Sequence, residues 1–415
     1  MFRTLGERTT LETPERNRLS GNRRSLHMGV DIPFLLVVIA LVIFGFLMVY
    51  SASMGYTTSE KYHYNFTKQF LLLVAGIAAA VFLTFLDYHH WQKLVLPAMS
   101  ITIVALVAIL VLKGVNQSAR DFIAGSIQPS ELAKIVTIIY LAVWLYSKRD
   151  RLWDIQFGLI PMGVMLGFLG ALIFLQPDLS ALITIFFLGG VMFFLAGGKM
   201  GQNLALVVLA IIVGFLVVQF DTRGTGQSRV ENFLMVLKDI TQADYHVRHS
   251  LMAFVNGEWF GVGIGKSEFK LYGLPVPETD SIFAVIGEEL GLVGAAIVVL
   301  MYVFLLWRGM KIAFQAPDGL GSLLAAGLTI WICIEAFINM AVMVGIMPFA
   351  GNALPFISRG GSNLLVSFTA VGIILNVSRL GVQHEEGSIL SEVVNLRWRD
   401  GRRRIPRSRR ASGAD

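Results

Sequence analysis

Long apolar runs recur along this chain and constrain its fold more than any other feature. A helix needs about 20 apolar residues to cross the roughly 30 Å hydrocarbon core of a bilayer. Only helices and closed barrels satisfy their backbone hydrogen bonds there, and unbroken runs of this kind indicate helices. We therefore predict an all-α polytopic membrane protein with about ten transmembrane helices, at residues 32–50, 70–86, 94–112, 132–146, 157–175, 179–196, 204–220, 282–307, 320–347 and 363–380.

Charge is concentrated in the two tails. Of 415 residues, 55% are hydrophobic and 15% are charged, against roughly 25% charged residues in soluble domains. Residues 1–28 carry six Arg and three Glu, and residues 384–415 carry eight Arg and five acids, which together account for the net charge of +6. The transmembrane domain at 29–383 is therefore neutral, which argues against a nucleic-acid partner. The two Arg-rich tails are predicted to be solvated and able to contact anionic lipid.

Basic loops indicate the orientation of the helices in the membrane. If the amino-terminal tail is cytoplasmic, alternation of the predicted helices places four basic segments on the same side, as the positive-inside rule prefers. These segments contain Lys93, 148–151, Lys199 and 308–311. Both termini are then cytoplasmic. The segment 221–280 becomes a large extracellular loop between the seventh and eighth helices, with short interfacial helices near 233–237 and 251–255.

Acidic residues cluster where the loop 221–280 meets the next apolar run. Asp280, Glu288 and Glu289 stand at its start, and a carboxylate carried toward the bilayer centre costs roughly 3 kcal/mol. Asp280 could simply cap the helix through free backbone N–H groups, as could Thr279 or Ser281. The alternative is a reactive carboxylate at the membrane surface.

A second charged motif opens the run at 132–146. Pro129 and Ser130 read as the first turn and N-cap of a helix. Glu131 and Lys134 are three residues apart, so they share a helix face and can form a structural ion pair. Alternatively, Lys134 or the neighbouring Arg120 supplies positive charge to a pyrophosphate group, with Glu131 holding it in place.

Other polar segments have mainly structural interpretations. Gln176, Pro177 and Asp178 form a turn and cap between two helices. Glu335 and Asn339 share one helix face and are predicted to make interhelical hydrogen bonds. The segment 351–363 combines Pro, paired Gly and Ser, which predicts a re-entrant stretch lining a site.

Glycine, histidine and cysteine add little chemistry. Gly257, Gly261, Gly263 and Gly265 indicate tight turns or, less directly, a phosphate cradle. His246 and His249 are spaced for one metal ion, but no carboxylate at a supporting spacing completes a ligand set. The single cysteine, Cys333, excludes an internal disulfide and a cysteine-built metal site.

Four motifs, in this order along the chain, resemble the SEDS family of FtsW and RodA. They are Gln128-Pro129-Ser130-Glu131, Gln176-Pro177-Asp178-Leu179, Pro277-Glu278-Thr279-Asp280 with Ile286-Gly287-Glu288-Glu289-Leu290-Gly291, and Leu354-Pro355-Phe356-Ile357-Ser358 with Gly360-Gly361-Ser362. The resemblance extends from about residue 31 to residue 379. Some positions depart from the family pattern, namely Asp121, His249, Glu278, Ser281, Glu335 and Arg359.

The resemblance implies a peptidoglycan glycosyltransferase that polymerises lipid II and works with a class B penicillin-binding protein. It implies a divalent cation, Mg²⁺ or Mn²⁺, as a cofactor. Asp280 stands where the family has an essential extracellular aspartate, and Glu131 and Lys134 stand where it has a functionally sensitive pair. The resemblance leaves open whether the chain serves elongation, division or sporulation.

The chemistry that the resemblance implies needs one general base. An α-linked pyrophosphate donor gives a β-1,4 glycan by inversion at one carbon, so a single carboxylate can take the proton of the acceptor hydroxyl. Asp280 is the candidate base. The cations available to stabilise the leaving pyrophosphate are Lys134, Arg120, Arg229 and Arg248. The remaining candidate substrate-binding residues, taken from the motifs, are Glu131, Gln128, Ser358, Gly360, Gly361 and Ser362.

Two other functions compete with polymerisation. A lipid II flippase also suits a polytopic bundle with intramembrane charges, but it needs access from both sides, whereas most motifs here fall on the predicted outer side. A non-catalytic scaffold of a division or elongation complex explains the tails but leaves the charged motifs without a role.

Overall fold

The structure is a computed structural model that describes residues 29–54, 59–113, 128–176, 178–220, 225–238, 245–348 and 351–401. Within these ranges the chain is helical and contains no strand, which confirms the predicted all-α class. The helices are α1 Ile32–Ser53, α2 Ser59–Phe85, η1 Tyr88–His90, α3 Trp91–Lys113, α4 Pro129–Lys148, η2 Arg149–Arg151, α5 Leu159–Leu175, α6 Leu179–Leu195, α7 Met200–Phe220, α8 Thr225–Lys238, α9 Tyr245–Gly257, α10 Phe269–Tyr272, α11 Ile282–Phe314, α12 Gly319–Met343 and α13 Gly361–Gly401.

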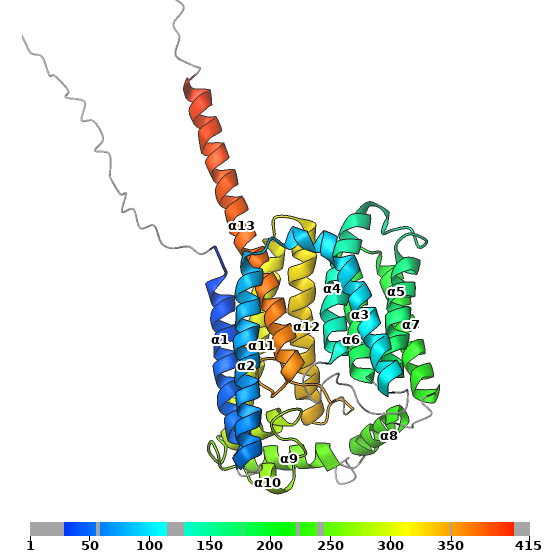
Figure 1. Ribbon diagram of the computed structural model, residues 1–415, viewed down its shortest axis with the longest axis vertical. Helices are drawn as coiled ribbons and strands as arrows, with labels where there is room; N and C mark the ends of the chain where they lie inside the picture. The colour runs from blue at the N-terminus through cyan, green and yellow to red at the C-terminus, as the bar shows by residue number, and fades with distance from the viewer. Residues whose placement is uncertain are drawn as a thin grey trace, which may run out of the picture.

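Helix α12 lies at the centre of the bundle and packs against α4, α6, α11 and α13 (Figure 1). Around this centre, α1 packs on α11, α2 on α13, α3 on α4 and α5, and α7 on α6. The outer faces of α1, α2, α3 and α5 expose large apolar side chains such as Leu36, Phe82, Ile101 and Val164. Such faces suit contact with lipid rather than water.

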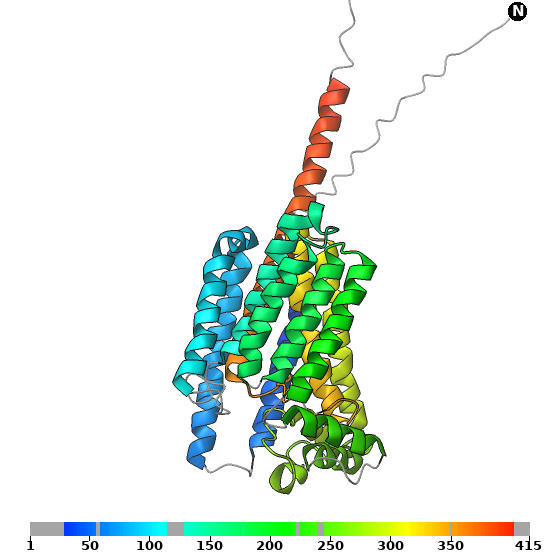
Figure 2. The same ribbon diagram turned by 90° about the vertical axis from the view of Figure 1, so that its right-hand side faces the viewer.

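Figures 1 and 2 show that the bundle has two distinct ends. The end at which α1 begins, and from which α13 projects, is called the tail end below. The short helices α8, α9 and α10 cluster at the opposite end, called the motif end below (Figure 2). Helices α8 and α9 include the predicted short helices near 233–237 and 251–255. Helix α13 continues through Gly401, so the first part of the predicted 384–415 tail is helical.

Each predicted apolar run coincides with one helix of the structure. Within the described ranges, seven helices are long and apolar enough to cross a membrane, namely α1, α2, α3, α4, α11, α12 and α13. Helices α5 and α6 are apolar but shorter. The bundle is thus that of a multi-pass membrane protein, while the count of ten spans stays a prediction.

Aspartates are the N-cap residues of α1, α6 and α12. Asp31 accepts a hydrogen bond from Phe34 N at 2.9 Å, and Asp318 accepts one from Gly321 N at 2.8 Å. Asp178 caps α6 by accepting from Ala181 N at 3.2 Å, as its turn motif predicted. Each carboxylate satisfies an N–H group that a first turn leaves unpaired.

The predicted cap of α4 is wrong by two residues. Gln128 is the N-cap and makes no side-chain cap hydrogen bond, because Pro129 already occupies the first helical position. Ser130 therefore lies inside the first turn, where its hydroxyl is free to bond across to another helix.

Candidate functional site

A polar cavity of about 310 Å³ lies at the motif end, where α4, α6, α11 and α13 all begin. The sequence segments that form it are far apart in the chain, and they include all four motifs singled out from the sequence. The residues lining it are Gln128, Glu131, Lys134, Asp178, Ser180, Thr279, Asp280, Glu335, Gly351, Asn352, Ala353, Arg359, Gly360, Gly361, Ser362 and Asn363.

Lys134 forms the cationic centre of the buried side of this cavity. Its ammonium group donates to Glu131 Oε1 at 2.8 Å, which confirms the predicted pair, and also to Glu335 Oε1 from α12. The amide of Asn363, at the start of α13, lies 3.3 Å from Glu131 Oε2 and 3.4 Å from Glu335 Oε2. Lys134 and Glu335 therefore join α4 to α12, and the amide of Asn363 joins α13 to both carboxylates.

Asp178 has a second role that the turn motif did not reveal. While one carboxylate oxygen caps α6, the other accepts from Ser130 Oγ at 2.7 Å and from Gln128 Nε2 at 3.0 Å. Ser180 donates to the capping oxygen at 3.0 Å. The carboxylate thus joins the first turn of α4 to that of α6, and it does so in the wall of the cavity.

Asp280 is half-buried in the cavity wall, one residue before the N-cap of α11, which is Ser281. Its backbone is held from two sides. Asn339 Nδ2 donates to Asp280 O at 2.9 Å, and Ser358 Oγ donates to Thr279 O at 2.7 Å. Asn339 thus bonds from α12 to the segment before α11 and not to another helix, while the predicted interhelical contact is made by Glu335 with Lys134 of α4. The peptide that carries Asp280 is fixed, while its side chain lies among the lining residues.

Of the stretch predicted at 351–363, residues 351–360 are irregular, and the last three residues belong to α13, which begins at Gly361. Its middle is buried, and Tyr302 of α11 donates a hydrogen bond to Pro355 O. Helix α1 approaches it so closely that a Cβ atom added at Gly45 would lie 2.4 Å from Phe356 O. Phe356 itself has φ 68°, an unusual conformation for a residue with a side chain. The stretch is held in place on several sides, and both of its ends line the cavity.

Two positions that depart from the SEDS pattern contact each other. Arg359 donates from Nη1 to Glu278 Oε1 at 2.6 Å and from its backbone N to Glu278 O at 2.7 Å. Glu278 is buried, and its other oxygen has no partner among the described residues. The two departures are thus complementary in charge, and together they fasten the peptide before Asp280 to the re-entrant segment.

The other predicted site residues differ in their position relative to the cavity. Gly360, Gly361 and Ser362 line the cavity, whereas Ser358 supports its wall through Thr279. Arg120 lies outside the described residues, as does Asp121. The remaining candidate cations lie on α8 and α9 and are absent from the described cavity lining, namely Arg229 and Arg248.

The histidine pair of α9 shows contacts within its own helix. His249 Nδ1 lies 2.8 Å from Tyr245 O, and the two rings pack with centroids 4.0 Å apart. These contacts account for the position of His249 without a ligand.

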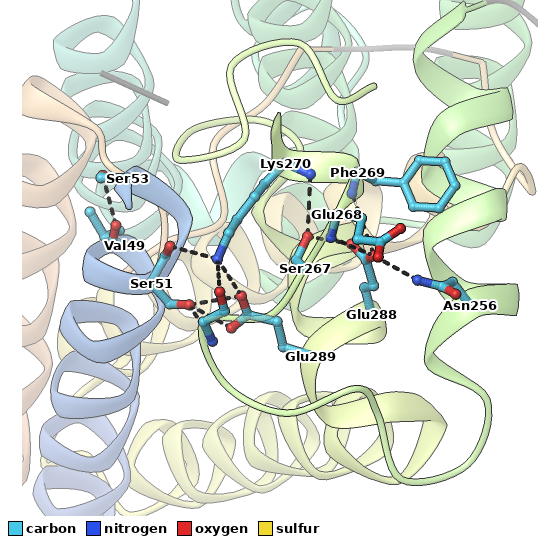
Figure 3. Close-up of polar contacts among 11 residues, drawn as sticks. Val49, Ser51, Ser53, Asn256, Ser267, Glu268, Phe269, Lys270, Glu288 and Glu289 are labelled. Atoms are coloured by element: carbon cyan, nitrogen blue, oxygen red, sulfur yellow. Dashed lines mark hydrogen bonds and ion pairs between the residues drawn. The ribbon is translucent and has the colours of Figure 1, made fainter. Parts of the chain in front are cut away.

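The acidic pair in the first turns of α11 stabilises the fold beside the site (Figure 3). Both carboxylates are fully buried. Glu289 accepts from Ser51 of α1 and from Lys270 Nζ at 2.9 Å. Glu288 accepts from Asn256 Nδ2 at 2.9 Å, from Ser267, and from the backbone N of residue 268 at 3.0 Å. Both carboxylates are bonded within the protein. Of the acids Asp280, Glu288 and Glu289, only Asp280 is among the described residues that line the cavity.

The glycines before α10 allow the loop to run against α11. A Cβ atom at Gly261 would lie 2.2 Å from Glu289 O, and one at Gly257 would lie 2.1 Å from Gly287 O. Val262 N and Gly263 N donate to the carbonyls of residues 288 and 289, both at 3.0 Å. These contacts explain Gly257 and Gly261 by close backbone packing, whereas Gly263 and Gly265 have positive φ values of 104° and 85°. The phosphate-cradle interpretation gains no support from them.

Comparisons with known proteins agree on one family. Residues 32–382 match the family described as "Cell cycle protein", to which FtsW, RodA and SpoVE give their names. A probable peptidoglycan glycosyltransferase FtsW of Geobacter metallireducens is 36% identical over 84% of this chain and 94% of its own length. The stage V sporulation protein E of Bacillus subtilis is 35% identical over 84% of this chain and 97% of its own.

Solved structures share the fold. The rod shape determining protein RodA of Thermus thermophilus, in a variant form, matches with a TM-score of 0.61 at 23% identity over 84% of this chain and 97% of its own. A chain from a peptidoglycan synthase complex matches with a TM-score of 0.66 at 24% identity over 85% and 98%. With the family match spanning nearly the whole bundle, this chain belongs to the FtsW, RodA and SpoVE family, as the SEDS motifs predicted.

Proposed function

We propose that this protein is a peptidoglycan glycosyltransferase that polymerises lipid II into β-1,4 glycan strands at the outer face of a bacterial plasma membrane. Relatives that carry the name peptidoglycan glycosyltransferase FtsW align over most of both chains, which supports the reaction class. The observation that supports the proposal is that Asp280 lines a polar cavity at the motif end of the bundle, on a peptide held by Asn339 and Ser358.

Asp280 is the proposed general base. The acceptor 4-hydroxyl loses its proton as it attacks the anomeric carbon of the donor, and a carboxylate within hydrogen-bond reach can take that proton. A base must also stay in position while the substrates move, and the two bonds to its own and the preceding carbonyl provide that restraint. Glu131 and Glu335 suit the role less well, because each is bonded to Lys134.

Binding of a pyrophosphate in this cavity needs positive charge beyond the described side chains. The described lining holds four carboxylates and two cations, and both cations are already paired with acids. The cavity is nevertheless where four helices begin, and the N-terminus of a helix carries about half a positive charge with free N–H groups. Together with Arg120 in the segment just before α4, these helix ends are our proposed pyrophosphate site.

A divalent cation is the proposed cofactor. The residues present fit a cation that binds few side chains and takes its other ligands from the substrate and water. Within the described part of the chain, no group of three or more His, Cys, Asp or Glu side chains could hold a metal ion alone. Mg²⁺ commonly uses only one or two carboxylates and takes its other ligands from substrate phosphates and water. Asp178 already accepts four hydrogen bonds, so Asp280 is the lining aspartate that would hold such a cation, whose charge would neutralise the leaving pyrophosphate.

The proposed partner is a class B penicillin-binding protein. The support is indirect and comes from the shared fold with a chain of a peptidoglycan synthase complex that coordinates polymerisation and crosslinking. Strand synthesis at the outer face would deliver a product to a crosslinking enzyme on that same face.

The test is lipid II polymerisation by the purified protein, alone and with its cognate penicillin-binding protein, with glycan strands resolved by length. The proposal expects strands that depend on added Mg²⁺ or Mn²⁺ and disappear on chelation. A parallel assay measures lipid II movement across vesicles containing the protein. Translocation without any strand synthesis would favour the flippase, and neither activity in a protein that still binds its partner would favour the scaffold.

A further inference from the structure

An apolar groove of about 450 Å³ lies between α6 and α7, away from the polar cavity. Two facing helical stripes line it. One stripe on α6 runs from Leu182 to Phe194, and one on α7 runs from Asn203 to Gly214, each at spacings of three and four residues. Exposed apolar side chains continue from the groove onto the lipid-facing surface, for example Ile183 and Phe187. The groove is therefore open to a ligand that arrives from the membrane.

Two glycines, which have no side chain, leave the space that forms the groove. Gly190 on α6 and Gly214 on α7 both line the groove, and a Cβ atom added at either would meet no atom of the described residues within 4 Å. Gly189 of α6 and Gly170 of α5 behave differently, since a Cβ atom at either would clash with a neighbouring side chain. Gly190 and Gly214 are thus not needed for close helix packing, and they leave a gap where α6 and α7 could have filled it.

One end of the groove is polar. Asn203, in the first turn of α7, is 8% exposed, and neither its amide nitrogen nor its amide oxygen has a partner among the described residues. A buried amide without hydrogen bonds is costly, so a ligand oxygen at this place would relieve the cost. Lys199 directly precedes α7, with its carbonyl accepting from Asn203 N, and its side chain is exposed beside Trp153.

The length and direction of the groove select the ligand. From residue 203 to residue 214 an α-helix rises about 16 Å, roughly the thickness of one leaflet of hydrocarbon. The polar end faces the tail end of the bundle, because α7 begins there. A lipid substrate of the polar cavity would have its head group at the motif end, and so would lie the other way round.

We propose that this groove binds one acyl chain of an anionic glycerophospholipid from the leaflet at the tail end. Asn203 hydrogen-bonds an ester or glycerol oxygen of the lipid, and Lys199 faces its phosphate. The site is separate from the proposed catalytic cavity, and it does not depend on the proposed function.

The test measures binding of phosphatidylglycerol to the purified full-length protein by native mass spectrometry and by the rise in unfolding temperature. Gly190→Leu fills the groove and is expected to weaken binding at least about tenfold, because it displaces two or more methylene groups. Asn203→Leu removes one hydrogen bond and is expected to weaken binding about fivefold. If Gly190→Leu does not fold, Gly214→Leu fills the same groove from α7.

Gly163→Leu is the matched control, because Gly163 on α5 is also half-buried, lies outside the described groove lining and has nothing within 4 Å of an added Cβ. It should bind phosphatidylglycerol within about twofold of the wild type. Equal affinity in all variants, or equal loss in the control, would overturn the proposal. A second probe, undecaprenyl phosphate, separates the two sources of an apolar chain. Displacement of phosphatidylglycerol by this polyprenyl lipid would assign the groove to the substrate tail instead.

Discussion

Lys134 is 3% exposed and lies between two carboxylates on different helices. A spacing of three residues was enough to predict its pairing with Glu131, because that contact is local. Glu335 is 201 residues further along the chain, and only the packing of α12 against α4 brings it to the same ammonium group. Sequence alone therefore predicted a pair where the structure has a three-membered network.

The network gives a sharper prediction than a pair does. Lys134→Met leaves two buried carboxylates without a cation and should cost about 3 to 5 kcal/mol of unfolding free energy. Adding Glu131→Gln should restore little, because Glu335 remains uncompensated, whereas adding both Glu131→Gln and Glu335→Gln should restore most of the loss. Thermal unfolding of the purified variants in detergent measures this. A double variant as stable as the triple one would mean that Glu335 is not part of the network.

Glu278 and Arg359 offer a second test at the residue scale. Arg359→Met leaves a buried carboxylate unpaired, but Arg359 is itself partly exposed, so the expected cost is about 1 to 3 kcal/mol. Adding Glu278→Gln should recover most of it, because the amide removes the charge and keeps the shape. If the two single variants and the double variant lose unfolding temperature additively, the contact contributes nothing to stability. The sequence flagged both positions as departures but gave no reason to pair them.

At the scale of elements, α11 is two helical pieces joined at Gly291, which has φ 70° and ψ −170°. The apolar run at 282–307 predicted one continuous helix, because hydrophobicity does not report a local change of backbone angles. Backbone contacts cause the break, since Leu292 N and Val293 N donate to carbonyls of the loop at residues 258 and 259. Those bonds take the place of part of the helical ladder.

Two glycines of this loop allow the cost of a strained backbone conformation to be measured apart from the cost of close backbone packing. Gly261 and Gly265 have similar positive φ values of 79° and 85°, but only Gly261 would place a Cβ atom against backbone. Gly265→Ala should cost about 1 to 2 kcal/mol from its conformation alone. Gly261→Ala should cost at least about 2 kcal/mol more and should reduce glycan synthesis, because the loop leads to Asp280. Equal unfolding temperatures for the two variants would show that the close approach to Glu289 does not matter.

At the scale of the whole molecule, the order of the helices predicts which end faces the cytoplasm. In a Cys333→Ser background, Glu268→Cys at the motif end should react with an impermeant maleimide on intact cells. Asp150→Cys, at an exposed position of the tail end, should react only after the membrane is broken. The opposite pattern would place the cavity on the cytoplasmic side and would exclude polymerisation at the outer face.

The overall architecture was largely predictable, because the length of an apolar run and the charge of a loop are local sequence properties that determine how a segment inserts into a bilayer. The cavity was predictable only as a set of separate motifs. Its wall combines the beginnings of four helices with a re-entrant segment, and no spacing in the sequence encodes which of these meet.

The proposed role of Asp280 has the most direct test in strand synthesis by Asp280→Asn, with Glu268→Gln as the matched control. Glu268 is an exposed acid at the same end of the bundle and is absent from the described cavity lining. General base catalysis is worth roughly a hundred- to ten-thousand-fold, so Asp280→Asn should make almost no glycan while it folds, inserts and binds its partner normally. The control should polymerise lipid II at the wild-type rate. Polymerisation by Asp280→Asn at a near wild-type rate would contradict its role as the base.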